Sequence, residues 1–160
     1  MSVYLSVAPP DGFDKWGNAD WERWLKDHPW EAAERVCSRG DWAIFLYELR
    51  IHAPKGKLVI EPLLEQLVNE RPLDSRQAED FRDALDIARD ELDARPGNSM
   101  KSGSSNFASP EDLEAMITAA RERLGHEPSL GDVWAEVFDQ IDKVLESAVL
   151  QKRGIYFGNL

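Results

Sequence analysis

The segment from Ser75 to Ala94 carries the most regular hydrophobic pattern in the chain. Its apolar residues recur alternately three and four positions apart, which places them on one narrow stripe of an α-helix. The stripe consists of Ala78, Phe81, Leu85, Ala88 and Leu92. Asp74 or Ser75 is placed to cap this helix at its N-terminus. Because a long helix with a narrow apolar stripe packs against neighbouring helices, the pattern predicts a mainly α fold.

Further helices are predicted on both sides of this segment from capping residues and apolar spacing. Trp21, Trp24 and Leu25 share one face of a helix that Pro29 ends. The helix predicted last begins at Ser129 or Asp132, carries Trp134 on its apolar face and continues up to Gly154. The other helices are expected at 30–38, at 58–71 and at 110–124, the last of them closed by Gly125.

Two segments favour strands, and one is ambiguous. Residues 2–8, SVYLSVA, alternate as a short strand does, and the apolar C-terminal segment GIYFGNL is placed to pair with them or to dock on the core. Residues 41–53, DWAIFLYELRIHA, fit a nearly fully buried helix capped by Asp41, with Trp42 on its apolar stripe. The alternative is a hairpin of 42–51 and 57–61 around Pro54–Gly56. We favour the helix.

The whole chain is predicted to form one domain. Its 160 residues and 18.2 kDa suffice to bury a sizeable core. We expect a compact, mainly α bundle of six or seven helices over residues 1–160, with a short strand pairing of the chain ends. Residues 96–109 are rich in serine and glycine, which predicts a flexible loop.

The charge of the chain limits its partners. The formal net charge is −11 and the isoelectric point is near 4.7. Binding to nucleic acid or to an anionic membrane surface requires an excess of lysine and arginine, so neither is expected. The acidic field is suited to steering a protein with a basic surface, and the alternative is that it serves only to keep the chain soluble. With neither a long apolar run nor a signal-peptide pattern, the expected location is the cytoplasm.

No motif identifies a chemistry. The sequence contains no HExxH, GxxxxGK[ST], GxGxxG or GxSxG pattern. His28, His52 and His126 lie in different segments without partners at ligand spacing, and the single Cys37 is expected to be a buried, inert thiol. We therefore predict no catalytic residue, no metal site and no cofactor.

The remaining feature is a repeated pattern of carboxylates. In the helix after Ser75, acidic residues recur every three or four positions along one side: Glu79, Asp83, Asp86, Asp90 and Asp93. Asp132, Glu136, Asp139, Asp142 and Glu146 nearly repeat the pattern near the C-terminus. Like charges at these spacings repel. The rows are explained by a solvated helix face, by a docking surface for a basic protein, or by a carboxylate metal cage.

Two functional hypotheses of different class follow. The first is a non-catalytic protein of the immunity or inhibitor type, which neutralises a toxin or enzyme by binding it. Its partner-binding residues would be Asp83, Asp86, Asp90, Asp93, Trp16 and Trp30, since tryptophans at segment ends beside an acidic face can form an interaction hot spot. The alternative is a small enzyme or ligand-binding protein with a pocket built from Tyr47, Glu48, Arg50 and His52.

Overall fold

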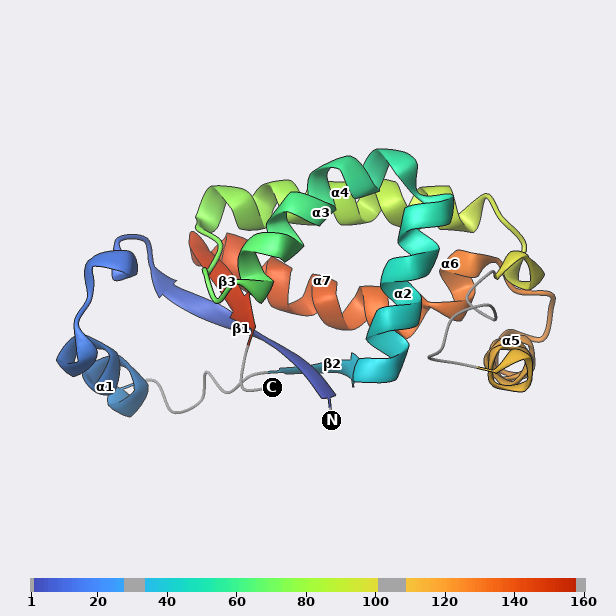
Figure 1. Cartoon of the computed structure of the whole chain (residues 1–160), viewed down its shortest axis with the longest axis horizontal. Coiled ribbons are helices and arrows are strands. Elements are labelled where there is room, and N and C mark those ends of the chain that lie inside the picture. Colours follow the sequence, from blue (N-terminus) through green and yellow to red (C-terminus); the bar gives the residue numbers. More distant parts are fainter. Residues whose placement is uncertain (1, 28–33, 101–108, 158–160) are drawn as a thin grey trace.

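A computed structural model describes residues 2–27, 34–100 and 109–157, apart from the side chains of Asp14 and Leu25. Within these residues the chain forms seven α-helices and a three-stranded antiparallel sheet, so the prediction of a mainly α fold is confirmed. Figure 1 shows α1 (Asn18–Asp27) at one end of the molecule and α5 (Pro110–Leu124) at the other, with the longer helices beside the sheet between them.

The central helices pack around α4 (Ser75–Asp93), as its apolar stripe predicts. Asp74 caps α4, and its carboxylate accepts a hydrogen bond from the Gln77 N–H at 2.8 Å. On one side lies α3 (Pro54–Val68), which approaches so closely that a side chain on Gly56 would lie 2.6 Å from the Ala88 Cβ. On the other side of α4 lies α7 (Ala135–Leu150). α2 (Arg39–His52) runs steeply across the direction of these helices and contacts α3 and α4 (Figure 1).

The sheet joins the two ends of the chain. Its central strand β1 (Ser2–Pro10) pairs with β3 (Arg153–Phe157) on one side, in a register that aligns Val7 with Ile155. The predicted pairing of the chain ends is thus confirmed. On its other side β1 pairs with β2 (Glu34–Ser38) in the order β2-β1-β3.

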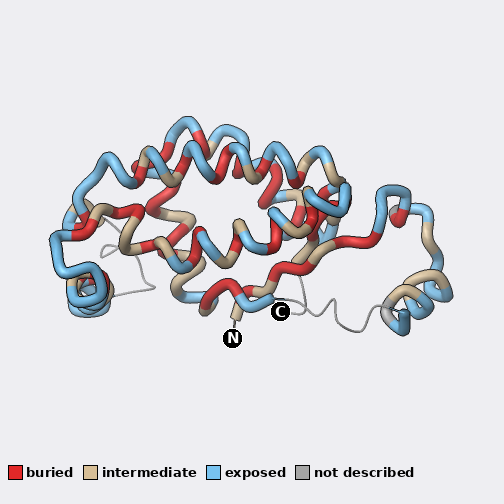
Figure 2. Tube along the Cα trace, turned by 180° about the vertical axis from the view of Figure 1, so that it is seen from behind, coloured by how far each residue is buried: buried red, intermediate tan, exposed pale blue. Residues whose placement is uncertain are grey.

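The core lies between the sheet and the inner sides of these helices. Its largest fully buried side chains are aromatic and come from α2, α4 and the C-terminal part of the chain: Phe45, Phe81, Trp134 and Phe138. Figure 2 shows the buried residues on the inward sides of the helices and the exposed residues along their outward sides. Trp134 is in the core as predicted, whereas Trp21, Trp24 and Trp42 are only half-buried.

The helix predicted over 30–38 is wrong for its described part. Residues 34–38 form β2, in which Val36 and Cys37 are buried. Pairing with β1 satisfies the backbone there and overrides a local helical preference that rests on alanine and glutamate. By contrast, α2 confirms the helix over the ambiguous segment, and Ser38 rather than Asp41 supplies its capping oxygen.

The last predicted helix is interrupted. A short α6 (Leu130–Val133) precedes α7, and Trp134 lies between them with non-helical φ and ψ of −99° and 9°. The chain leaves helical geometry after Leu150 and enters β3 at Arg153. Two short 3₁₀ helices, η1 (Phe13–Lys15) and η2 (Gly97–Ser99), complete the described elements.

The predicted flexible loop at 96–109 begins with a fixed segment. The Gly97 N–H donates to the Pro128 carbonyl at 2.8 Å, and Pro96 forms a bridge with Ser129. Gly97 is buried in this contact. The rest of the predicted loop, residues 101–108, lies outside the described residues. Among the helices that are described, none has the length and apolar character required to cross a bilayer.

Candidate functional site

The carboxylates of α4 point away from the core. At 3.6 residues per turn, Glu79, Asp83, Asp86 and Asp90 fall on the side of the helix opposite to the buried Phe81 and Ala88. All four are exposed. They form one uninterrupted acidic row along α4.

The arginines of α4 turn sideways toward α7. The Nε atom of Arg82 donates to Asp142 at 3.0 Å, and an Nη atom of Arg89 donates to Asp139 at 2.7 Å. The hydrogen bond to Asp142 raises the pKa of Arg82, and the nearby charges of Asp142, Glu146 and Asp86 raise it further. Arg82 and Arg89 therefore neutralise carboxylates of α7 more directly than they neutralise the acidic row of α4.

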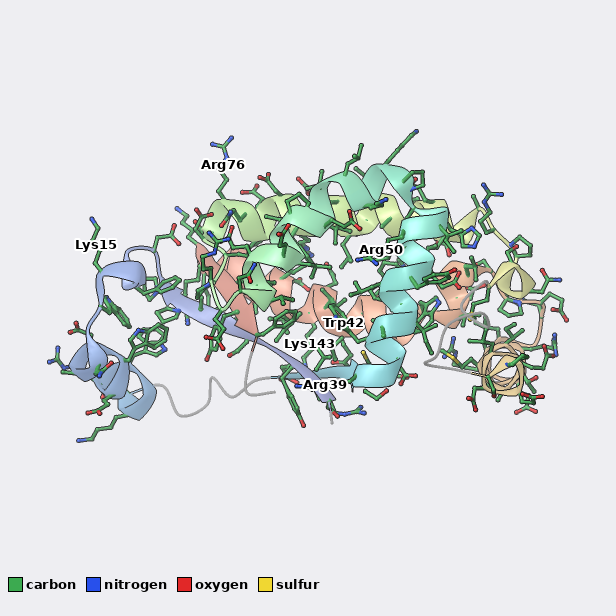
Figure 3. All side chains as sticks on the ribbon, in the orientation of Figure 1. Lys15, Arg39, Trp42, Arg50, Arg76 and Lys143 are labelled. Atoms are coloured by element: carbon green, nitrogen blue, oxygen red, sulfur yellow. The ribbon has the colours of Figure 1, made fainter. Side chains whose placement is uncertain are left out.

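The two helices together form an acidic face, which we define by its exposed and half-exposed carboxylates. They are Glu79, Asp83, Asp86 and Asp90 of α4 and Asp139, Asp142 and Glu146 of α7. Arg82, Arg89, Arg76 and Lys152 are the cations beside them. Asp80 lines the same hollow as Arg76 and Lys152, so eight carboxylates against four cations leave four negative charges in excess. Two basic groups elsewhere are also paired, Arg50 with Glu61 at 2.9 Å and Lys143 with Glu34 at 3.5 Å. Arg76, by contrast, projects outward from α4 (Figure 3).

Asp93 differs from the other three aspartates predicted to bind a partner. Its carboxylate accepts a hydrogen bond from the Ser129 hydroxyl at 3.0 Å and occupies the space that a Cβ on Gly131 would take. This carboxylate fixes α6 against the end of α4. We therefore do not count Asp93 in the acidic face, although it is exposed.

Trp16 belongs to an aromatic cluster at the α1 end of the molecule. Its ring centroid lies 5.6 Å from that of Trp21 and 5.9 Å from that of Trp24, and the Phe13 ring lies 5.9 Å from Trp21. The opposite side of the cluster is held by the buried Arg153, whose guanidinium carbon lies 4.7 Å from the centre of the Trp24 ring. Trp30, the other tryptophan predicted to bind a partner, lies outside the described residues.

The aromatic cluster opens into a cleft of about 610 Å³ between η1, α1 and the connection from α3 to α4. We call it the aromatic cleft and define it by its aromatic and charged lining: Phe13, Trp16, Trp21, Asp11, Glu70, Arg71 and Asp74. Asp11 joins the cleft to α4, because its carboxylate accepts hydrogen bonds from the Ser75 hydroxyl at 2.7 Å and from the Ser75 N–H at 3.1 Å.

The residues of the alternative pocket hypothesis do not converge. Glu48 and His52 lie one turn apart on the buried side of α2, where His52 Nε2 is 3.3 Å from the Glu48 carboxylate and 3.1 Å from the Ser99 carbonyl. Arg50 points away from them into a groove of about 350 Å³ between α2 and α3. Tyr47 is half-buried. The buried pair connects α2 to η2, and the charged arginine lies on another side of the helix.

Cys37 is buried in β2, as its predicted role requires. Burial raises the pKa of its thiol to about 12, and the negative charge of Asp41 contributes in the same direction. A thiol with so little thiolate is a poor nucleophile and a poor metal ligand. Within residues 2–27, 34–100 and 109–157, no group of three or more histidine, cysteine or acidic side chains is arranged to hold a metal ion.

Comparison of the chain with protein-family models, with curated proteins and with solved structures found no match. Any functional conclusion therefore depends on the geometry of its own residues.

Sequence reasoning missed much of the aromatic cleft. It found Trp16 from its position at a segment end but gave no role to Phe13 or Glu70. The Pro9–Gly12 turn and the Pro72 break, which bring the walls of the cleft together, are visible in the sequence. Their proximity in space depends on the bonds between Asp11 and Ser75, two residues that are 64 positions apart.

Proposed function

We propose that this chain is a non-catalytic protein that binds a basic protein partner through its acidic face. In the most specific form of the proposal it is an immunity or inhibitor-type protein of the cytoplasm, which neutralises a toxin or an enzyme by covering a basic surface. The observation that carries the proposal is the acidic row on α4, which is fully exposed and faces away from the core.

The energetics of the row support a role in binding. Neighbouring carboxylates at these spacings each cost a helix a few tenths of a kcal/mol. A lysine at one of these positions would remove the repulsion. In contrast, the acids of α7 at the same interface are compensated by Arg82 and Arg89. The uncompensated charge is therefore concentrated on the outward side of one helix, where a partner can approach it.

Such a face acts mainly on the rate of association. Opposite charges on two surfaces accelerate encounter and hold the surfaces in register, and this effect weakens as salt screens it. The face by itself supplies little apolar area, so the affinity must come from contacts beside it. The aromatic cleft lies next to the N-terminal end of the acidic row and offers such contacts, since Ser75 borders both.

The proposal is tested by affinity capture from the native host with two matched baits. One bait carries Asp83→Asn, Asp86→Asn and Asp90→Asn. The control carries Glu111→Gln, Glu114→Gln and Glu122→Gln, which remove the same charge from exposed positions of α5. We expect the wild type and the control to retain a basic protein that the α4 variant loses, and association with the purified partner to slow as salt is added. Equal retention by both baits, or a partner without a basic surface, would refute the proposal.

A further inference from the structure

We propose that the aromatic cleft binds an arginine side chain, which the basic partner inserts beside the acidic face. This inference rests on the proposed function for the source of the arginine. The rings and charges that line the cleft determine the chemical nature of the bound group.

The lining of the cleft has the chemistry of a guanidinium site. Trp16 and Trp21, whose ring planes meet at 73°, both line the cleft. A guanidinium placed over an indole face is attracted by the ring quadrupole. Its planar shape also allows stacking, which the ammonium group of lysine cannot achieve.

The charges around the rings favour a cation. Asp11, Glu70 and Asp74 contribute three carboxylates, and Arg71 contributes one guanidinium. The hydrogen bonds that Asp11 and Asp74 accept come from neutral donors on Ser75 and Gln77 and not from a cationic side chain. The cleft therefore carries an excess of two negative charges, and an anionic ligand would be repelled.

The same aromatic cluster already holds one arginine of this chain. The Arg153 guanidinium lies over Trp24, while its Nε donates to the Ala8 carbonyl at 2.6 Å. That contact combines one indole face with oxygen acceptors. Trp16 contacts Trp24 on one side and lines the cleft on the other. The cleft offers the same two kinds of group, with Trp16 and Trp21 as the indole rings and its carboxylates as the oxygen acceptors.

Glu70 occupies a position at which glycine is usual. Its φ is +58°, and it ends α3 in a left-handed turn in which the Arg71 N–H reaches back to the Gln66 carbonyl at 3.0 Å. A side chain in this conformation is unfavourable compared with glycine. The turn therefore keeps a carboxylate at the cleft at the expense of local stability.

The inference is tested by NMR titration with an acetylated, amidated tetra-arginine peptide. Its controls are the matched citrulline peptide, which has the same shape without the charge, and the matched lysine peptide. The indole N–H signals of Trp16 and Trp21 report on the cleft, and that of the buried Trp134 reports on the fold. We expect the first two signals to move with the arginine peptide while the Trp134 signal stays in place. The lysine peptide should bind more weakly, and the citrulline peptide should leave both cleft signals unmoved.

Two variants probe the contributions of the ring and the charge. Trp16→Leu removes one indole, and Glu70→Gln removes one charge without changing the backbone requirement. Each should weaken the binding of the arginine peptide about fivefold, which corresponds to ~1 kcal/mol. Glu122→Gln on the distant α5 is the control with the same loss of charge and should leave binding almost unchanged. Retention of the wild-type melting temperature shows that a variant is folded.

The outcomes separate this inference from the proposed function. If the peptide moves backbone signals of α4 while the indole signals of Trp16 and Trp21 stay unchanged, the cleft is not an arginine site, and the acidic face keeps its role. Equal binding of the arginine and lysine peptides would overturn the assignment of a guanidinium. If the cleft binds arginine but the α4 aspartate variant captures the same proteins as the wild type, the cleft inference holds and the proposed role of the acidic face fails.

Discussion

Replacing three aspartates of the acidic face by asparagine is expected to stabilise the protein. The acidic row together with Asp93, the next carboxylate along α4, contains four neighbouring pairs of like charge at spacings of three or four residues, and the changes at Asp83, Asp86 and Asp90 remove all four. At a few tenths of a kcal/mol per pair, the relief amounts to about 1–2 kcal/mol.

Part of this gain is offset. Asp86 is one of the charges that raise the pKa of Arg82, so removing Asp86 also removes an attraction within the helix. We therefore expect a net increase of ~1 kcal/mol in the free energy of unfolding. For a domain of this size, that corresponds to a rise in melting temperature of about 3 °C. The helix propensities of aspartate and asparagine are similar and contribute little.

Urea denaturation at low ionic strength measures the effect, because urea carries no charge and does not screen the repulsion. In ~1 M salt the screening length falls to about 3 Å, and the difference between variant and wild type should disappear. The matched control is Asp142→Asn on α7, which removes the same kind of charge but breaks the ion pair with Arg82. It should destabilise the protein by about 0.5 kcal/mol. If the triple aspartate variant of α4 is no more stable than the wild type at low salt, the reasoning is refuted, because the carboxylates of the row would then not destabilise the folded protein by mutual repulsion.

Two further predictions concern the core and the sheet. The Cys37 thiol, with its pKa raised to about 12 from its ordinary value of 9.0, should react with iodoacetamide at pH 8 roughly a hundredfold more slowly in the folded than in the unfolded protein. The stabilisation that comes from burying this thiol in its neutral form should be complete below pH 9 and should be lost as the pH rises through about 12. A thiol that reacts as fast in the folded as in the unfolded protein would contradict its burial. Gly154→Ala should destabilise the protein by about 3 kcal/mol in thermal or urea unfolding, because the new Cβ would overlap the Leu73 carbonyl, whereas Gly17→Ala meets open space and should leave the packing unchanged.

The helices were predictable because their signals are local. The capping residues Asp74 and Ser109 and the closing Gly125 lie where the sequence predicts helix boundaries, and the structure uses each of them. The start of α3 was missed, since it depends on another element. The carboxylate of Glu91 on α4 accepts hydrogen bonds from the first N–H groups of α3, at 3.1 Å from Lys55 and at 2.8 Å from Gly56. No local pattern reveals a cap supplied from 35 residues away.

The failed helix at 30–38 has the same origin. Val36 and Cys37 become strand residues because β1 offers them a partner, and β1 is in place because β3 pairs with its other edge. Periodicity over nine residues cannot register a contact with residues at either end of the chain. Of the candidate site, the exposure of the acidic row followed from helical spacing alone, whereas the pairing of Arg82 and Arg89 with α7 required knowing which helices are neighbours.

The described tryptophans near the N-terminus, Trp16, Trp21 and Trp24, are all half-buried, and a residue far along the chain covers one of the three rings. Arg153 covers the Trp24 ring and satisfies the Ala8 carbonyl, so it ties α1 to the sheet from a position 129 residues later. Trp16 packs against Trp24 with its ring tilted by 51°, and Trp16 and Trp21 both line the aromatic cleft. The rings of Trp16 and Trp21 already pack against Trp24 and Phe13, so fewer rotamers are open to them before a partner binds. Since less side-chain freedom remains to be lost on binding, such a surface gains more affinity from each contact than a mobile one would.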